Sequence, residues 1–173
     1  MSQINSDLKS LIDQALTEDM AYNDVTTSGL ISDNLVGKAI LMSKATGILA
    51  GADVALAVFR RIDPDLDTHL LIHDGAIIHP GEIIARIEGK ISSILRAERT
   101  SLNFLQHLSG IATETDRYVK TVQRFKCQIS DTRKTIPGMR GLQKYAVKVG
   151  GGSNHRMNLM DRALDDTLNK KVV

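Results

Sequence analysis

The sequence is poor in aromatic residues and in cysteine. Its 173 residues include no Trp, 3 Phe and 3 Tyr, so aromatic residues make up only 3% of the chain. Stacking surfaces for single-stranded nucleic acid are therefore scarce, which disfavours that class of partner. The single cysteine, Cys127, cannot form an internal disulfide. Disulfides mark oxidising compartments, so this cysteine usage favours the cytosol.

Long apolar runs and a leader-like N-terminus are also lacking. No apolar run approaches the roughly 20 residues that a membrane-spanning helix needs. The first seven residues have neither a basic start nor an apolar core, so we expect no secretory signal. With 42% hydrophobic and 24% charged residues, the composition is that of an ordinary soluble globular protein. The length suits one domain or slightly more.

The net charge of +2 conceals a strong asymmetry along the chain. Residues 1–95 contain 7 Lys or Arg against 13 Asp or Glu, whereas residues 96–162 contain 13 against 5. A basic half-chain indicates an anionic partner. Because the aromatic residues and motifs of nucleic-acid binders are missing, a small anionic substrate is the better interpretation.

The basic residues concentrate between residues 131 and 156, just before and after a run of three glycines, Gly150–Gly152. Guanidinium groups bind carboxylate or phosphate with two parallel hydrogen bonds, and glycines allow backbone N–H groups to approach an anion closely. The alternative is a solvated basic loop. The basic or potentially basic residues are Arg133, Lys134, Arg140, Lys144, Lys148, His155 and Arg156. Of these, we expect Arg140, Lys144 and Lys148 to be solvated charges.

Apolar spacing predicts a mixed α and β pattern in the first 90 residues. Helices are expected over residues 4–17 and 51–63, where apolar residues recur every three or four positions. β-structure is expected over 35–50, 70–73, 76–79 and 82–89, with a tight turn at Pro80-Gly81. The segment Asp24–Thr27 is interpreted as a local turn held by its own side chains.

The remaining residues read as two helices followed by a strand–loop–helix unit. One helix is expected from Ser92 or Ser93 to about His107 and another over 113–123, because Ser109-Gly110 is a typical helix-end signal. A short strand is expected over 127–130 and a helix over 141–149. Asp131–Lys134 would then follow the carboxyl end of the strand, which in α/β barrels faces the active site.

Three histidines, His69, His73 and His79, could suggest a metal site. Neither a cysteine nor a closely spaced second histidine gives them ligand spacing, so we interpret them as surface or packing residues and assign no metal ligand.

Six blocks of the sequence together form a recognisable pattern: Glu98–Gln106, Leu108–Thr113, Asp131–Thr135, Pro137–Arg140, Lys144–Val147 and Gly150–Met157. In this pattern the chain resembles the quinolinate phosphoribosyltransferase family (nicotinate-nucleotide diphosphorylase, carboxylating). The resemblance runs from about residue 7 to 164. A relative encoded with molybdate transporters shares much of the pattern and is kept as an alternative.

The resemblance implies a two-part fold: an N-terminal α+β domain, residues 1–112, and the first part of a type II phosphoribosyltransferase α/β barrel, residues 113–173. It also implies a cytoplasmic homodimer in which one subunit completes the other's active site. The implied reaction converts quinolinate and phosphoribosyl pyrophosphate, with Mg²⁺, into nicotinate mononucleotide, pyrophosphate and CO₂ in NAD biosynthesis. No nucleic acid or membrane partner is expected.

The resemblance also assigns roles to particular side chains. Arg133, His155 and Arg156 would hold the carboxylates of quinolinate. Thr132 would lie alongside them, and Lys134 would face the negative charge of the substrates. Arg99 would reach into the neighbouring subunit's site. No catalytic residue is assigned. The six substrate-binding candidates are Arg99, Thr132, Arg133, Lys134, His155 and Arg156.

The chain departs from the family pattern after Leu164. Asp166 falls where the family has a substrate-binding lysine, and 47 residues remain from Cys127 to the end, whereas a common α/β barrel needs about 250. We therefore expect a truncated barrel without the family's Mg²⁺ ligands and without turnover on its own. The competing hypothesis is a non-catalytic dimerisation or binding module, and a nucleic-acid binder ranks third.

Overall fold

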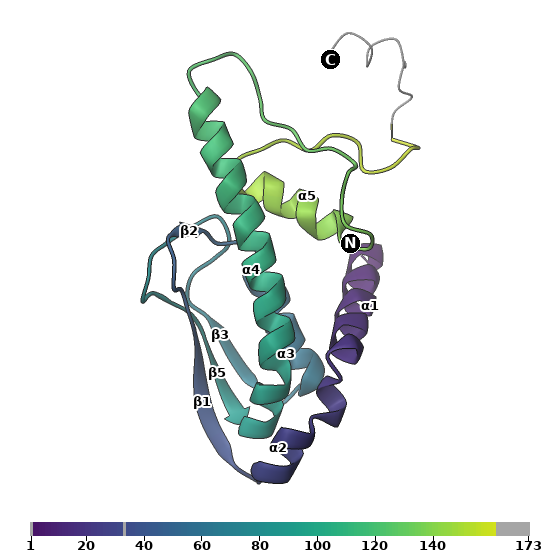
Figure 1. Ribbon diagram of the computed structural model, residues 1–173, viewed down its shortest axis with the longest axis vertical. Coiled ribbons are helices and arrows are strands. Elements are labelled where there is room, and N and C mark those ends of the chain that lie inside the picture. The colour runs from purple at the N-terminus through teal and green to yellow at the C-terminus, as the bar shows by residue number, and fades with distance from the viewer. Residues whose placement is uncertain (1, 33, 162–173) are drawn as a thin grey trace.

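A computed structural model of the chain describes residues 2–32 and 34–161, with side chains from residue 7 onward. Figure 1 shows a long central helix, α4 (Ile91–Val122), with a small sheet on one side and the helix α1 (Ser2–Glu18) on the other. Asp166, which the family pattern would replace by lysine, lies outside the described residues. No described helix is both long and apolar enough to span a membrane.

The helix α4 is continuous, so the predicted interruption at Ser109-Gly110 is wrong. The Ser109 hydroxyl donates to the Ala50 carbonyl oxygen at 3.1 Å and accepts from the Ala50 N–H at 3.0 Å. Leu108 and Ala112 are fully buried on either side. A glycine inside a helix costs about 1 kcal/mol relative to alanine, which this burial and hydrogen bonding outweigh. The expected domain boundary at 112/113 therefore falls inside α4, and the boundary itself stays a prediction.

Three antiparallel strands form the main sheet, in the order β1-β5-β3. They are β1 (Val36–Met42), β5 (Ile83–Lys90) and β3 (Asp67–Leu70). The short strands β2 (Gly47–Ile48) and β4 (Ile77–Ile78) pair with each other in a second sheet. The strands on either side of Pro80-Gly81 thus join different sheets, a pairing that local turn chemistry does not specify. The strand expected over 70–73 forms earlier, at 67–70.

Short helices complete this layer. The side-chain contact predicted between Asp24 and its threonine neighbours is confirmed, but the segment is helical and not a simple turn. Asp24 caps the helix α2 (Val25–Leu30), accepting from the Thr27 N–H at 3.0 Å and from the Thr27 hydroxyl. A 3₁₀ turn, η1 (Ala21–Asn23), precedes it. The helix α3 (Ala52–Ile62) packs on α4 and buries Val58 and Phe59. Most of the apolar core therefore lies between α3, α4 and the sheet.

A strand–loop–helix unit follows α4. Its helix α5 (Arg140–Val149) lies across the second half of α4 (Figure 1). The strand predicted over 127–130 is reduced to one parallel bridge, between Ser130 and Ser153. Among residues 2–32 and 34–161 the strands close no barrel. The fold is thus an α+β layer followed by the opening strand–loop–helix part of an α/β barrel, as predicted.

Candidate functional site

The parallel bridge brings together the two basic segments that the sequence singled out. The Ser153 N–H donates to the Ile129 carbonyl oxygen at 2.8 Å, and the Asp131 N–H donates to the Ser153 carbonyl oxygen at 3.1 Å. Figure 1 shows the two segments running side by side beyond α5. Residues 131–135 and 154–156 therefore leave the strand pair at the same end, which in α/β folds is where ligands bind.

A buried ion pair lies directly behind this end. The Lys144 Nζ lies 2.5 Å from the Asp131 Oδ1, and the two side chains are only 1% and 7% exposed. Lys144 also donates to the His155 carbonyl oxygen at 3.0 Å, while the His155 N–H donates to the Asp131 Oδ1 at 2.8 Å. The expectation that Lys144 is solvated is therefore wrong. Because α5 folds back against the preceding strand, its inward lysine finds a carboxylate partner.

Asn154 completes the same cluster. With its amide nitrogen turned inward, the side chain donates to the Asp131 Oδ2 at 3.0 Å and to the Lys144 carbonyl oxygen at 2.9 Å. Both carboxylate oxygens of Asp131 are thereby bonded. A fully satisfied polar cluster of this kind fixes backbone geometry more narrowly than apolar packing does.

Arg140, the first residue of α5, also joins the two loops. Its Nε donates to the Thr135 hydroxyl at 3.0 Å and its Nη1 donates to the Met157 carbonyl oxygen at 3.2 Å. The prediction of a solvated Arg140 is therefore also wrong, because both loops offer it acceptors. Lys148 is exposed, in agreement with the prediction.

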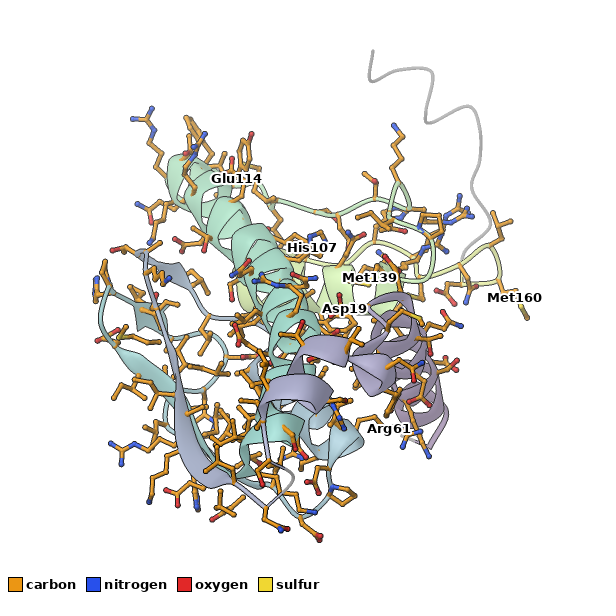
Figure 2. All side chains as sticks on the ribbon, turned by 60° about the horizontal axis from the view of Figure 1, so that its bottom comes forward. Asp19, Arg61, His107, Glu114, Met139 and Met160 are labelled. Atoms are coloured by element: carbon orange, nitrogen blue, oxygen red, sulfur yellow. The ribbon has the colours of Figure 1, made fainter. Side chains whose placement is uncertain are left out.

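The loop between strand and helix is also tied to α4. The Ile136 N–H donates to the Gln143 Oε1 at 3.0 Å, and the Gln143 Nε2 lies 3.0 Å from the His107 Nε2. Figure 2 labels His107 on α4 and Met139, the residue before α5. Sequence reasoning missed this contact because it joins residues 36 positions apart.

The predicted anion-binding side chains differ in exposure. Arg133 is half-buried, and its Nε is buried without a hydrogen-bond partner among the described residues. Thr132, Lys134 and His155 are exposed, and the Thr132 hydroxyl accepts from the Lys134 N–H at 3.1 Å. Arg156 is half-buried. The backbones of these segments are adjacent, whereas the convergence of the side chains on one ligand stays a prediction.

Arg99 lies elsewhere in this chain. It is exposed on α4, two helical turns or about 12 Å before His107, the α4 residue that contacts Gln143. Its predicted role in a neighbouring subunit's site stays a prediction.

Metal ligands do not cluster in the described part of the chain, where no three His, Cys, Asp or Glu side chains are placed to share an ion. Of the three histidines considered above, His69 Nε2 lies 2.9 Å from Asp67 and His79 Nδ1 lies 3.4 Å from the Thr46 hydroxyl. All three are exposed, including His73.

A tyrosine connects α5 to the N-terminal layer. The Tyr145 hydroxyl donates to the Asp74 Oδ2 at 2.7 Å, and the same carboxylate accepts from the Gly51 and Ala52 N–H groups at the start of α3, at 2.7 and 2.9 Å. Partial burial, together with this bond to a carboxylate, raises the pKa of Tyr145 well above its usual value. The hydroxyl therefore acts as a fixed donor.

Comparisons with known proteins agree with this arrangement. The family model for the quinolinate phosphoribosyl transferase N-terminal domain matches residues 24–109, and that for the C-terminal domain matches residues 111–168. Nicotinate-nucleotide pyrophosphorylase [carboxylating] of Mycobacterium leprae is 41% identical over 90% of this chain and 56% of its own length. A probable enzyme of the same name from Bacillus subtilis is 40% identical over 89% of this chain and 53% of its own length.

Solved structures give the same result. The nicotinate-nucleotide pyrophosphorylase of Francisella tularensis superposes with a TM-score of 0.85 at 39% identity, covering 91% of this chain and 55% of the other. The chain thus spans about half the length of the curated relatives it matches. With both domain models matched in order, the chain belongs to the quinolinate phosphoribosyl transferase family.

Proposed function

We propose that this chain supplies the quinolinate-binding part of an enzyme that makes nicotinate mononucleotide, pyrophosphate and CO₂ from quinolinate and phosphoribosyl pyrophosphate, in NAD biosynthesis. The names of its relatives support this reaction. The main structural support is the Ser130–Ser153 bridge, which sends the Arg133 segment and the His155-Arg156 segment out at one end of a strand pair. A pyridine dicarboxylate needs several fixed cationic donors, and the two segments contain the basic side chains that would supply them.

Arg133 is the strongest candidate for a carboxylate contact. Its Nε is buried without a partner among the described residues, and buried donors in folded proteins are normally hydrogen-bonded. A substrate carboxylate would satisfy this guanidinium, in the two-pronged geometry that arginine favours.

The remaining contacts come from both segments. His155 and Arg156 hold the second carboxylate, Thr132 lies alongside, and the exposed Lys134 faces the negative charge of the substrates. Catalysis in this scheme is mainly positioning: the ring nitrogen of quinolinate meets the anomeric carbon of the ribose as pyrophosphate leaves. Decarboxylation follows at the ring carbon beside the ribosylated nitrogen. The bond from this carbon to its carboxylate breaks and CO₂ leaves, while the electron pair stays on the carbon, stabilised by the adjacent cationic nitrogen. This carbon then takes up a proton from solvent.

Mg²⁺ would accompany phosphoribosyl pyrophosphate in the family's reaction. The described residues bring no three potential ligands together, so they do not fit a protein-held Mg²⁺ site. We therefore assign no residue to the ion and no step of the binding scheme to it.

A homodimer is part of the proposal, with Arg99 completing the neighbouring subunit's site. The outer face of β1 exposes Val36, Ile40 and Met42, 68%, 50% and 47% exposed, with Lys38 between the first two on the same face. This apolar strip, interrupted by one lysine, is of the kind found at interaction surfaces. We also propose the cytosol as the location, since the exposed free thiol of Cys127 suits a reducing compartment.

Isothermal titration calorimetry with quinolinate tests the proposal on the whole chain. Wild type and Lys148→Met should bind quinolinate alike, since Lys148 is exposed on the same helix but outside the site. Arg133→Met should weaken binding at least about tenfold, because hydrogen bonds to charged groups contribute about 1.5–3 kcal/mol each. Absence of quinolinate binding by the folded wild type would overturn the proposal.

A non-catalytic dimerisation module is the second candidate, and the apolar strip on β1 favours it. Sedimentation of wild type and Ile40→Lys separates the two. A dimer that Ile40→Lys dissociates, together with no quinolinate binding, would favour the module. Binding of quinolinate would also argue against the alternative that this chain functions as the relative encoded with molybdate transporters.

A further inference from the structure

The Asp131–Lys144 pair makes an unusual set of bonds to one residue. Both backbone polar groups of His155 bond to it: the N–H donates to the Asp131 Oδ1 at 2.8 Å and the carbonyl oxygen accepts from the Lys144 Nζ at 3.0 Å. The two partners are themselves 2.5 Å apart. One ion pair therefore holds the peptide units on both sides of the His155 α-carbon, which restricts the direction of its side chain.

Burial makes this restraint stiff. Lys144 is 1% exposed and Asp131 is 7% exposed, so neither partner can exchange its bonds for water without opening the structure. A buried charge that loses its partner is strongly disfavoured, so the pair keeps its geometry. Asn154 adds a further tie, since its inward amide donates to the Asp131 Oδ2 at 3.0 Å.

The positive charge of Lys144 is neutralised within the protein by Asp131. Its ammonium group points at a carboxylate and a carbonyl oxygen within the protein, whereas Lys134 remains exposed. Lys144 therefore differs from Lys134, because its ammonium group is not placed to contact an anion itself.

Packing of the strand–loop–helix unit has other sources. A Cβ at Gly150 would collide with the Ala112 carbonyl oxygen, so α5 lies tightly on α4 through this glycine. The Ser130–Ser153 bridge joins the two strand segments independently. α5 thus has contacts with α4 besides the ion pair, and the ion pair also bonds to the residue before Arg156.

We propose that Asp131 and Lys144 are positioning residues of the anion site, which act by fixing the backbone of His155 so that His155 and Arg156 meet one carboxylate of the substrate. This inference rests on the proposed function. It assigns a role to two residues outside the set predicted to touch the substrate.

Two measurements on the full chain test it: hydrogen exchange of the His155 amide, and calorimetric titration of quinolinate. In Lys144→Met the His155 amide should exchange at least tenfold faster and the quinolinate dissociation constant should rise about tenfold or more, since the His155 carbonyl oxygen and the buried Asp131 carboxylate lose their donor. The Gly152 amide, bonded to the Val147 carbonyl oxygen at 3.0 Å, is the internal reference and should change less. Lys148→Met is the matched control and should change neither quantity.

The double variant Asp131→Asn/Lys144→Met controls for unfolding of the single variant. It removes both charges together and so leaves no buried charge without a partner. It should regain the wild-type melting temperature more fully than Lys144→Met does, yet still bind quinolinate about tenfold more weakly than wild type. Wild-type affinity in either folded variant would overturn the positioning role and leave the proposed function intact. Failure of wild type itself to bind quinolinate would overturn the proposed function, and the positioning role with it.

Discussion

The N-terminal layer and the strand–loop–helix unit are held together by different interactions. In the layer, α3, α4 and the sheet bury a continuous apolar core that includes Val58, Phe59 and Leu108. In the described residues after α4, Ala146 is the only fully buried apolar side chain. There, hydrogen bonds and one ion pair add to the packing of the partly buried Met139, Leu142 and Val149. Apolar packing supplies stability and tolerates small shifts, whereas a polar cluster specifies directions.

This difference fits the proposed function, in which the strand–loop–helix unit binds the ligand and the layer supports that unit. A ligand with two carboxylates needs donors at defined directions, which the polar cluster around Asp131 can provide. The layer, in turn, gives α5 a rigid surface on α4. Substitutions in the layer, in the strand–loop–helix unit and in the link between them should therefore have different consequences.

The largest effect is expected from Phe59→Ala in the layer. Phe59 is 1% exposed between α3 and its neighbours, and removing a buried phenyl ring costs about 3–5 kcal/mol of unfolding free energy. Urea denaturation followed by circular dichroism measures it, with exposed Tyr118→Ala as the control. A loss below about 1 kcal/mol would show that the layer is not the main source of stability.

Gly150→Ala should loosen the second region and spare the first. The new Cβ would collide with the Ala112 carbonyl oxygen and crowd Thr115, so α5 must move away from α4. Overpacking of this kind costs about 1–3 kcal/mol. Hydrogen exchange should accelerate in α5 and at His155, while the amides of β5 keep wild-type rates. Equal acceleration in both regions would contradict the comparison. Gly141→Ala is the control, since a Cβ there has no neighbour within 4 Å.

Tyr145→Phe removes one hydrogen bond between the two regions and so measures how far they stabilise each other. The variant keeps the ring and removes the hydroxyl bond to Asp74, which caps the start of α3. A loss of about 1 kcal/mol is expected by urea denaturation, the usual contribution of one such hydrogen bond. A neutral result would mean that Asp74 holds α3 without help from α5.

Ser93→Ala should give the smallest effect, and a pH-dependent one. The Ser93 hydroxyl donates to the Asp63 Oδ2 at 2.7 Å and holds the pKa of Asp63 below its ordinary value of 3.8. Because the folded pKa is lowered, the stabilisation is complete above pH 3.8 and is lost as pH falls through the lower folded value. Wild type and variant should thus differ in melting temperature at pH 7 and converge in acid. A gap that widens in acid would contradict the assignment.

The sequence predicted the layer better than the loops. The helices α1, α3 and α5 follow from apolar spacing and end signals, and their bounds agree within two residues. The continuity of α4 could not be predicted, because Ser109 looks like a helix-end residue until its hydrogen bonds to Ala50 are known. Pairing of β4 with β2 likewise depends on contacts far apart in sequence.

For the candidate site, sequence reasoning located the two basic segments but misjudged two of their cations. Lys144 and Arg140 look like solvated charges on one helix, and only the fold shows the acceptors they reach. An aspartate at the end of a strand, followed by a lysine on the returning helix, is the signal that could have revealed the buried pair. The reach of Arg99 into a second subunit stays a prediction, since it depends on the partner.

Titration of quinolinate into the isotopically labelled chain, followed by NMR of the arginine side chains and histidine rings, tests whether Arg133 and His155 bind the same quinolinate molecule. The proposed function predicts that the Arg133 Nε–H and the His155 ring shift together, with one dissociation constant, while Arg117, exposed on α4, does not shift. Quinolinate-dependent shifts confined to other residues, or separate dissociation constants for Arg133 and His155, would contradict it.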